Sequence, residues 1–147
     1  MKILFAILFI AITLVNTGAR AQFDPKNQAL TGCPQPEDIG PLHLYGLWRA
    51  EFAGLPQGAT LLFEKHPEWT GSVSGAINRN GERARISADI EQGDFSLEES
   101  GDGVQVSAVW QGTVVAGSCG KEIRGTWNSQ SNRTLYPFVL RKLPGWQ

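Results

Sequence analysis

The feature that most constrains the fold is a strict alternation of side chains over residues 45–52, Tyr-Gly-Leu-Trp-Arg-Ala-Glu-Phe. Every second residue is small or apolar, and the residues between them include an arginine and a glutamate. The apolar side comprises Gly46, Trp48, Ala50 and Phe52. A period of two is typical of a β-strand with one dry face and one wet face.

Seven further stretches follow, each short and each bounded by Gly, Asn, Asp or Pro. Asn80-Gly81 is a strong signal for a two-residue hairpin turn. No stretch has a helical period, and connections this short require antiparallel neighbours. The eight strands are expected at residues 44–52, 59–64, 71–78, 83–90, 95–99, 104–115, 121–128 and 134–142.

These strands predict an all-β fold, an eight-stranded antiparallel up-and-down barrel. Closure buries the apolar face of every strand around one core and leaves no free edge. A two-sheet β-sandwich is the alternative. In the longest segment the inward set is expected to begin at Val104 and Val106. Glu99 also has inward parity, but the end of a short strand is expected to leave it in solvent.

The first 21 residues have the pattern of a cleaved secretory signal peptide. Lys2 precedes an apolar run over residues 3–15, and Ala19-Arg20-Ala21 supplies a cleavage site. The run is too short to span a membrane comfortably, since a span needs about 20 residues. We therefore expect an exported protein, periplasmic or secreted, without membrane insertion after cleavage. Its parts are residues 1–21, the signal peptide; 22–40, an extended arm; and 41–147, the barrel domain.

The two cysteines, Cys33 and Cys119, are expected to form a disulfide that tethers the arm. In an up-and-down barrel both lie at the end where the first strand begins, as a disulfide requires. Residues 30–33, Leu-Thr-Gly-Cys, also match a bacterial lipidation motif. Lipidation of Cys33 is disfavoured, because polar residues separate the motif from the apolar run and Cys119 would lose its partner.

Charge excludes one class of partner. Without Lys2 and Arg20, 11 basic residues face 14 acidic residues, and the formal charge is −3. We expect no binding to nucleic acid, because no positive excess attracts phosphate groups.

Gly46-Leu47-Trp48 resembles the G-x-W motif that opens lipocalins and their calycin relatives. Arg141, near the end of the last expected strand, resembles the arginine that packs over that tryptophan. Trp110 and Trp127 are similar to the late-strand tryptophans of avidin-like barrels. The resemblance implies a calycin-like barrel with Arg141 near Trp48. The polar residues with which avidins hold biotin are not recognisable, so biotin binding is not implied.

An eight-stranded barrel is either filled by side chains or holds one small ligand. Large inward aromatics favour a filled core, whereas small inward residues favour a cavity. The tentative pocket for a small, mostly apolar molecule comprises Trp48, Gly75, Ala88, Trp110, Gly125 and Trp127. We expect no cofactor and no metal, and no motif places a catalytic base beside a nucleophile, so an enzyme is not expected.

The alternative function is recognition of an exported protein, as an inhibitor or adaptor. Similar small exported barrels inhibit proteases by inserting an N-terminal arm, and residues 22–40 supply an arm of adequate length. The loops at the end opposite the disulfide form a second candidate surface. The arm can instead be a strap that plugs the barrel end. The sequence does not give the oligomeric state.

Overall fold

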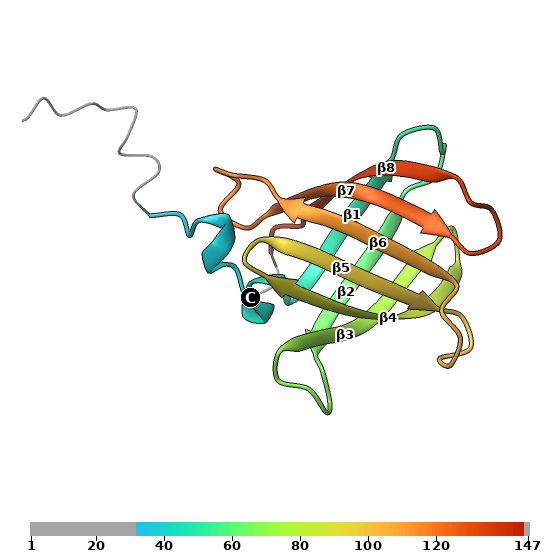
Figure 1. Ribbon diagram of the computed structural model, residues 1–147, viewed down its shortest axis with the longest axis horizontal. Coiled ribbons are helices and arrows are strands. Elements are labelled where there is room, and N and C mark those ends of the chain that lie inside the picture. Colours follow the sequence, from blue (N-terminus) through green and yellow to red (C-terminus); the bar gives the residue numbers. More distant parts are fainter. Residues whose placement is uncertain (1–31, 146–147) are drawn as a thin grey trace, which may run out of the picture.

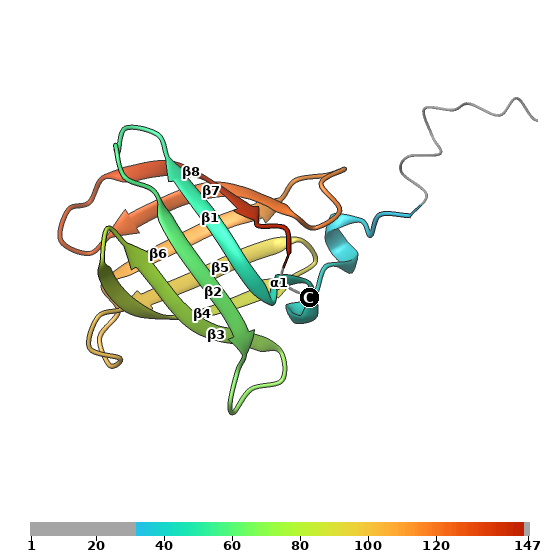
Figure 2. The ribbon, with the colours of Figure 1, turned by 180° about the vertical axis from the view of Figure 1, so that it is seen from behind.

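The computed structural model describes residues 32–145. The expected signal peptide and residues 22–31 of the expected arm lie outside this range. Eight strands form one closed antiparallel barrel in chain order, and β1 pairs with β8 to complete it (Figures 1 and 2). The barrel prediction is confirmed. The elements are η1 (Pro36–Asp38), α1 (Pro41–Leu44), β1 (Gly46–Phe52), β2 (Ala59–Lys65), β3 (Ser72–Arg79), β4 (Glu82–Glu91), β5 (Asp94–Ser100), β6 (Ala108–Val114), β7 (Glu122–Ser129) and β8 (Leu135–Lys142).

The barrel core follows the predicted alternation. In β1 the buried residues are Trp48, Ala50 and Phe52, with exposed charged residues between them. The same pattern holds in β5, where alternate residues are buried. Each strand therefore contributes one apolar face to a shared interior, which supplies most of the free energy that stabilises the fold. Among the described residues, no helix has the length and apolar character needed to cross a bilayer.

We call the end where β1 begins the floor and the opposite end the roof. A strap formed by residues 32–45 lies at the floor, beside the ends of the strands (Figure 1). Cys33 and Cys119 form the expected disulfide, with their Cα atoms 4.7 Å apart. Ile39 is 2% exposed and packs against Gly120, where a Cβ atom would meet its side chain. The strap therefore covers this end of the core.

The strap differs from the extended arm that the sequence predicted. Its described part contains the single turn η1, and α1 immediately precedes β1. Both turns begin with a proline, which suits the first helical position because its missing N–H would have no partner there. Four-residue and three-residue turns are too short to produce a helical period in the sequence.

The sixth strand is shorter than predicted. It begins at Ala108, and Val104, expected inside, is 86% exposed. The reason lies in the β5–β6 loop, residues 101–107. The Asp102 carboxylate accepts hydrogen bonds from the backbone N–H groups of Val104 and Gln105, both at 2.8 Å. This local turn directs the chain away from the ladder before it can pair.

Arg141 lies near Trp48 along the strand ladder, as expected, but on the other face, so its side chain does not pack over the indole as the family resemblance implies. Trp48 lies opposite Lys142 in the β1–β8 ladder, and the Lys142 Nζ atom is 5.8 Å from the indole centroid. Lys142 also donates a 2.7 Å hydrogen bond to the carbonyl oxygen of His43. Burial lowers the pKa of Lys142, with a further contribution from the charge of Lys121. The register differs by one residue, which moves the side chain to the other face.

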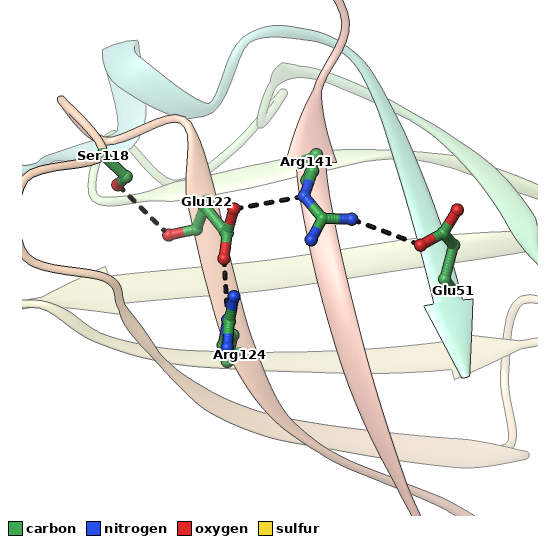
Figure 3. A network of polar contacts seen from close by, with 5 residues as sticks. All are labelled: Glu51, Ser118, Glu122, Arg124 and Arg141. Carbon is green, nitrogen blue, oxygen red and sulfur yellow. Dashed lines mark hydrogen bonds and ion pairs between the residues drawn. The ribbon is translucent and has the colours of Figure 1, made fainter. Parts of the chain in front are cut away.

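Arg141 instead belongs to an ion-pair network on the outer face of β7, β8 and β1 (Figure 3). Its Nε atom donates to Glu122 at 3.1 Å, and its Nη1 atom donates to Glu51 at 3.2 Å. Arg124 Nε donates to the other Glu122 oxygen at 2.7 Å. The hydrogen bond from Arg124, and then that from Arg141, hold the pKa of Glu122 below its usual range.

Candidate functional site

The structure brings two of the predicted pocket residues together in the roof half of the barrel. Trp110 in β6 and Trp127 in β7 are direct partners in the ladder. Their indole N–H groups donate to the same oxygen, Oε1 of Glu99, at 2.7 and 2.8 Å. Trp110 is fully buried and Trp127 is 9% exposed.

Trp48 lies apart from this pair, at the floor. Its indole N–H donates a 2.7 Å hydrogen bond to the carbonyl oxygen of Leu44 in α1. Its ring meets Phe63 edge to face, with centroids 6.2 Å apart. Trp48 therefore joins the strap to the core.

The predicted small residues allow strands to approach closely. A Cβ atom on Gly75 would overlap the carbonyl oxygen of Leu62, and one on Gly125 would overlap that of Gln111. Ala88 is buried between Val73 and Leu97 in the sheet. At the two glycines, backbone from the neighbouring strand occupies the space that a larger side chain would need.

Aromatic rings pack across the interior in the roof half of the barrel. Phe52 lies 5.2 Å from Trp110 and 5.5 Å from Trp127, measured between ring centroids. Trp110 also meets Phe138 at 4.7 Å in an edge-to-face arrangement. Tilted and edge-to-face contacts at these distances are the favoured geometries of aromatic pairs. Because these rings fill the interior, a site that a ligand can reach lies at the roof end of the aromatic cluster.

Glu99 is the principal surprise of the structure. The prediction that it is exposed is wrong, since only 2% of the residue is accessible. It keeps the inward parity of Phe95 and Leu97, and β5 extends one residue further, to Ser100. Four hydrogen bonds satisfy its carboxylate: two from indole groups and two from Arg79. A buried carboxylate needs such partners, because desolvation of an unpaired charge is very costly.

Arg79, the last residue of β3, is the second charged residue of this cluster. Its guanidinium group donates to the two Glu99 oxygens at 2.6 and 2.9 Å. The guanidinium carbon lies 4.9 Å from the Trp127 ring centroid and 5.5 Å from that of Phe52. The strand expected over residues 71–78 leaves Arg79 in the turn, but its parity with Ile77 indicates an inward side chain.

The turn that follows positions Arg79 at the roof. Asn80 and Gly81 have φ angles of 53° and 92°, as a two-residue hairpin turn requires. β3 and β4 therefore remain paired up to the Arg79–Glu82 partners. The side chain of Arg79 is 24% exposed, so part of it reaches the surface while its guanidinium group is paired with Glu99.

A recess of about 210 Å³ opens beside this cluster. It is lined by apolar, polar and charged residues from β3, β4, β5 and the β5–β6 loop. Its lining residues are Ile77, Arg79, Glu82, Arg83, Ala84, Glu99, Gly101 and Ser107. We call it the roof recess.

A wider polar groove of about 440 Å³ adjoins it and shares Gly101 and Ser107. The groove lies between the β5–β6 and β7–β8 loops. Hydrogen bonds from the backbone of Gln105, then Val104, hold the pKa of Asp102 in this groove below its usual range. A third groove, of about 530 Å³, crosses the outer face of β4, β5 and β6 away from the charged cluster.

At the opposite end of the molecule, the β2–β3 loop presents an exposed tryptophan. Trp69 is 61% exposed and stacks on His66, with ring centroids 4.7 Å apart and an interplanar angle of 11°. His66 Nδ1 accepts the backbone N–H groups of Glu68 and Trp69, both at 3.1 Å. These contacts hold the exposed ring in one orientation.

Neither a protein-family model nor a curated protein matches the chain. Among solved structures, a de novo designed fluorescence-activating β-barrel aligns at 17% identity with a TM-score of 0.46. That alignment covers 70% of this chain and 96% of the other. EF1p2_mFAP2b bound to DFHBI aligns at 11% identity with a TM-score of 0.43, over 75% and 100% of the two chains.

Proposed function

We propose that this protein is an exported binding barrel whose ligand occupies the roof recess. The observation that carries the proposal is the Arg79–Glu99 pair at the base of the recess. A charged pair beside aromatic rings offers directional contacts in a site with little water, where such contacts are strong. The rest of the interior is closely packed and apolar.

The volume and lining favour a compact ligand with both apolar and polar parts. Ligand pockets for drug-sized molecules span about 300–1,000 Å³, so a recess of 210 Å³ suits a smaller molecule. Ile77 and Ala84 supply apolar contact, and Glu99 and Ser107 supply polar groups. The ligand envisaged from the sequence was mostly apolar and lay within the barrel; we now place it at the mouth.

Tryptophan emission gives a direct test, because both roof tryptophans lie in the charged cluster. We expect small molecules from a varied panel to change the emission and raise the melting temperature of the wild-type protein. Ala84→Leu should block this response by filling the recess. Ala76→Leu, on the outer face of the neighbouring strand, is the matched control. A panel without a binder, or binding that Ala84→Leu leaves intact, would refute the proposal.

A protein-binding role, as an inhibitor or adaptor, is the second candidate, and Trp69 favours it. Exposed tryptophans held in one orientation are common anchors of protein interfaces. Capture of one partner by the wild type, lost with Trp69→Ala, would support this role. A chain lacking residues 22–32 tests the arm separately. Retention of the partner by both altered proteins would count against both surfaces.

We propose a binding role without catalysis, because the buried carboxylate of Glu99 accepts four hydrogen bonds from Arg79 and the two roof tryptophans in this structure. Export is supported by the Cys33–Cys119 disulfide, since such bonds persist in oxidising compartments. Export is tested by fractionation of the host cell, with the protein detected by antibody in each fraction.

A further inference from the structure

The Arg79 guanidinium has the surroundings of a bound planar cation. Two carboxylate oxygens of Glu99 lie in hydrogen-bond range, and the rings of Phe52 and Trp127 lie within 5.5 Å of the guanidinium carbon. A carboxylate together with aromatic faces is an arrangement that recognises cations in water-poor sites. Here a side chain of the same protein occupies that arrangement.

The receptor half of this arrangement does not depend on Arg79. Trp110 and Trp127 donate to Glu99 Oε1 from two neighbouring strands and fix the carboxylate. Their rings are held in turn by contacts with Phe52 and Phe138. The anionic and aromatic groups therefore stay in place when the guanidinium leaves, so the site remains preorganised.

Arg79 is held less completely than the groups around it. Its Nε atom is buried and makes no hydrogen bond to any residue that the structure describes. A buried donor without a partner is unfavourable, which lowers the cost of moving this side chain to solvent. The residue is also the last one before the Asn80-Gly81 turn, and its side chain is 24% exposed. Its side chain can therefore turn outward without breaking the strand ladder.

We propose that the roof site takes a small molecule bearing a guanidinium or amidinium group, and that Arg79 occupies the site when no ligand is bound. The inference rests on the proposed function, whose ligand it specifies. The cationic head of the ligand replaces the Arg79 head on Glu99, between Phe52 and Trp127. The remainder of the ligand lies in the roof recess against Ile77 and Ala84.

Arg79 acts as an internal competitor in this arrangement. The apparent affinity of a ligand falls by the fraction of molecules in which its site is free, so a site that is about 1% free weakens binding about 100-fold. Removal of the side chain should reveal the intrinsic affinity. The part of a ligand that lies in the recess gains contact with Ile77 and Ala84, which adds to its affinity in competition with Arg79.

The experiment uses benzamidine and methylguanidine as probes, with neutral benzamide as the chemical control. Calorimetry at millimolar probe concentrations should show binding to Arg79→Ala at least 10-fold tighter than to the wild type. The double variant Arg79→Ala/Glu99→Gln should not show this tighter binding, because the amide of the glutamine at position 99 carries no charge to attract the probe. Benzamide should bind neither protein tightly. Absence of probe binding to folded Arg79→Ala would overturn the inference.

A measurement on the wild type covers the case in which Arg79→Ala does not fold. The Arg79 Nε–H signal in an NMR spectrum of the labelled protein should shift saturably toward that of a solvated arginine as either probe is added. An unchanged signal at saturating probe would overturn the inference. Other panel molecules can bind the wild type and lose binding in Ala84→Leu while neither cationic probe binds. In that case the roof recess is a binding site, and only the proposed cationic class of ligand is wrong.

Discussion

Replacement of Glu99 by glutamine is the most direct test of the buried charge cluster. The substitution preserves size and leaves one carbonyl oxygen for the indole N–H groups. It removes the negative charge, and its amide N–H₂ faces the donors of Arg79, which pair with the carboxylate at 2.6 and 2.9 Å. Arg79 is then left as a largely desolvated cation without its counter-ion.

The structure sets the expected magnitude. Removing one partner of a buried ion pair typically costs about 3–5 kcal/mol. Arg79 is 24% exposed and can turn partly into water, so we expect the lower end of the range, about 3 kcal/mol. For a domain of this size, a loss of about 3 kcal/mol lowers the melting temperature by roughly 10–15 °C.

Urea unfolding followed by circular dichroism measures this loss. Glu98→Gln is the matched control, because Glu98 is the exposed neighbour on the same strand and should change stability by less than about 0.5 kcal/mol. Arg79→Met and the double variant complete a mutant cycle, with an expected coupling of more than about 1 kcal/mol. A cost for Glu99→Gln below about 1 kcal/mol, or the same cost for both glutamates, would show that the carboxylate is not paired inside the barrel.

Four other substitutions test separate parts of the structure. Cys33→Ser should cost a few kcal/mol without changing the circular dichroism spectrum; a melting temperature that reduction leaves unchanged would contradict the strap's role. Trp48→Ala should cost about 3–5 kcal/mol in urea unfolding, and a value below about 1 would argue against its burial. Gly125→Ala should destabilise by about 1–3 kcal/mol because its Cβ overlaps backbone, whereas Gly71→Ala, with open space around it, should not. Glu122→Gln should lower stability near neutral pH; since the folded pKa of Glu122 is depressed, the difference from wild type should shrink as the pH falls below the ordinary pKa of a glutamate and vanish below the lower folded pKa, and a constant difference would contradict the ion pairs.

The candidate site was only partly predictable from the sequence. Trp110 and Trp127 were identified by their inward parity, and they do lie together at the roof. Glu99 had the same parity, yet its charge and its place at a strand end favoured solvent. Its true position depends on Arg79, whose compensating charge comes from another hairpin. A rule that considers one residue at a time cannot detect such a pair.

Local backbone geometry accounts for what the sequence by itself determined. Alternation along each segment fixed which face turns inward, short turns fixed antiparallel pairing, and closure followed because every strand had one apolar face. The position of Cys33 and Cys119 at one end followed from the same connectivity. These properties depend on neighbours in the chain, which the sequence displays directly.

Only the tertiary structure decided which side chains meet across the interior. The β1–β8 register placed Lys142 instead of Arg141 beside Trp48, and a one-residue difference in register reverses the face of a side chain. Likewise, Arg79 and Glu99 meet because closure brings the ends of β3 and β5 to one mouth. Contacts of this kind depend on the three-dimensional course of several strands at once, and no periodicity within a single strand encodes them.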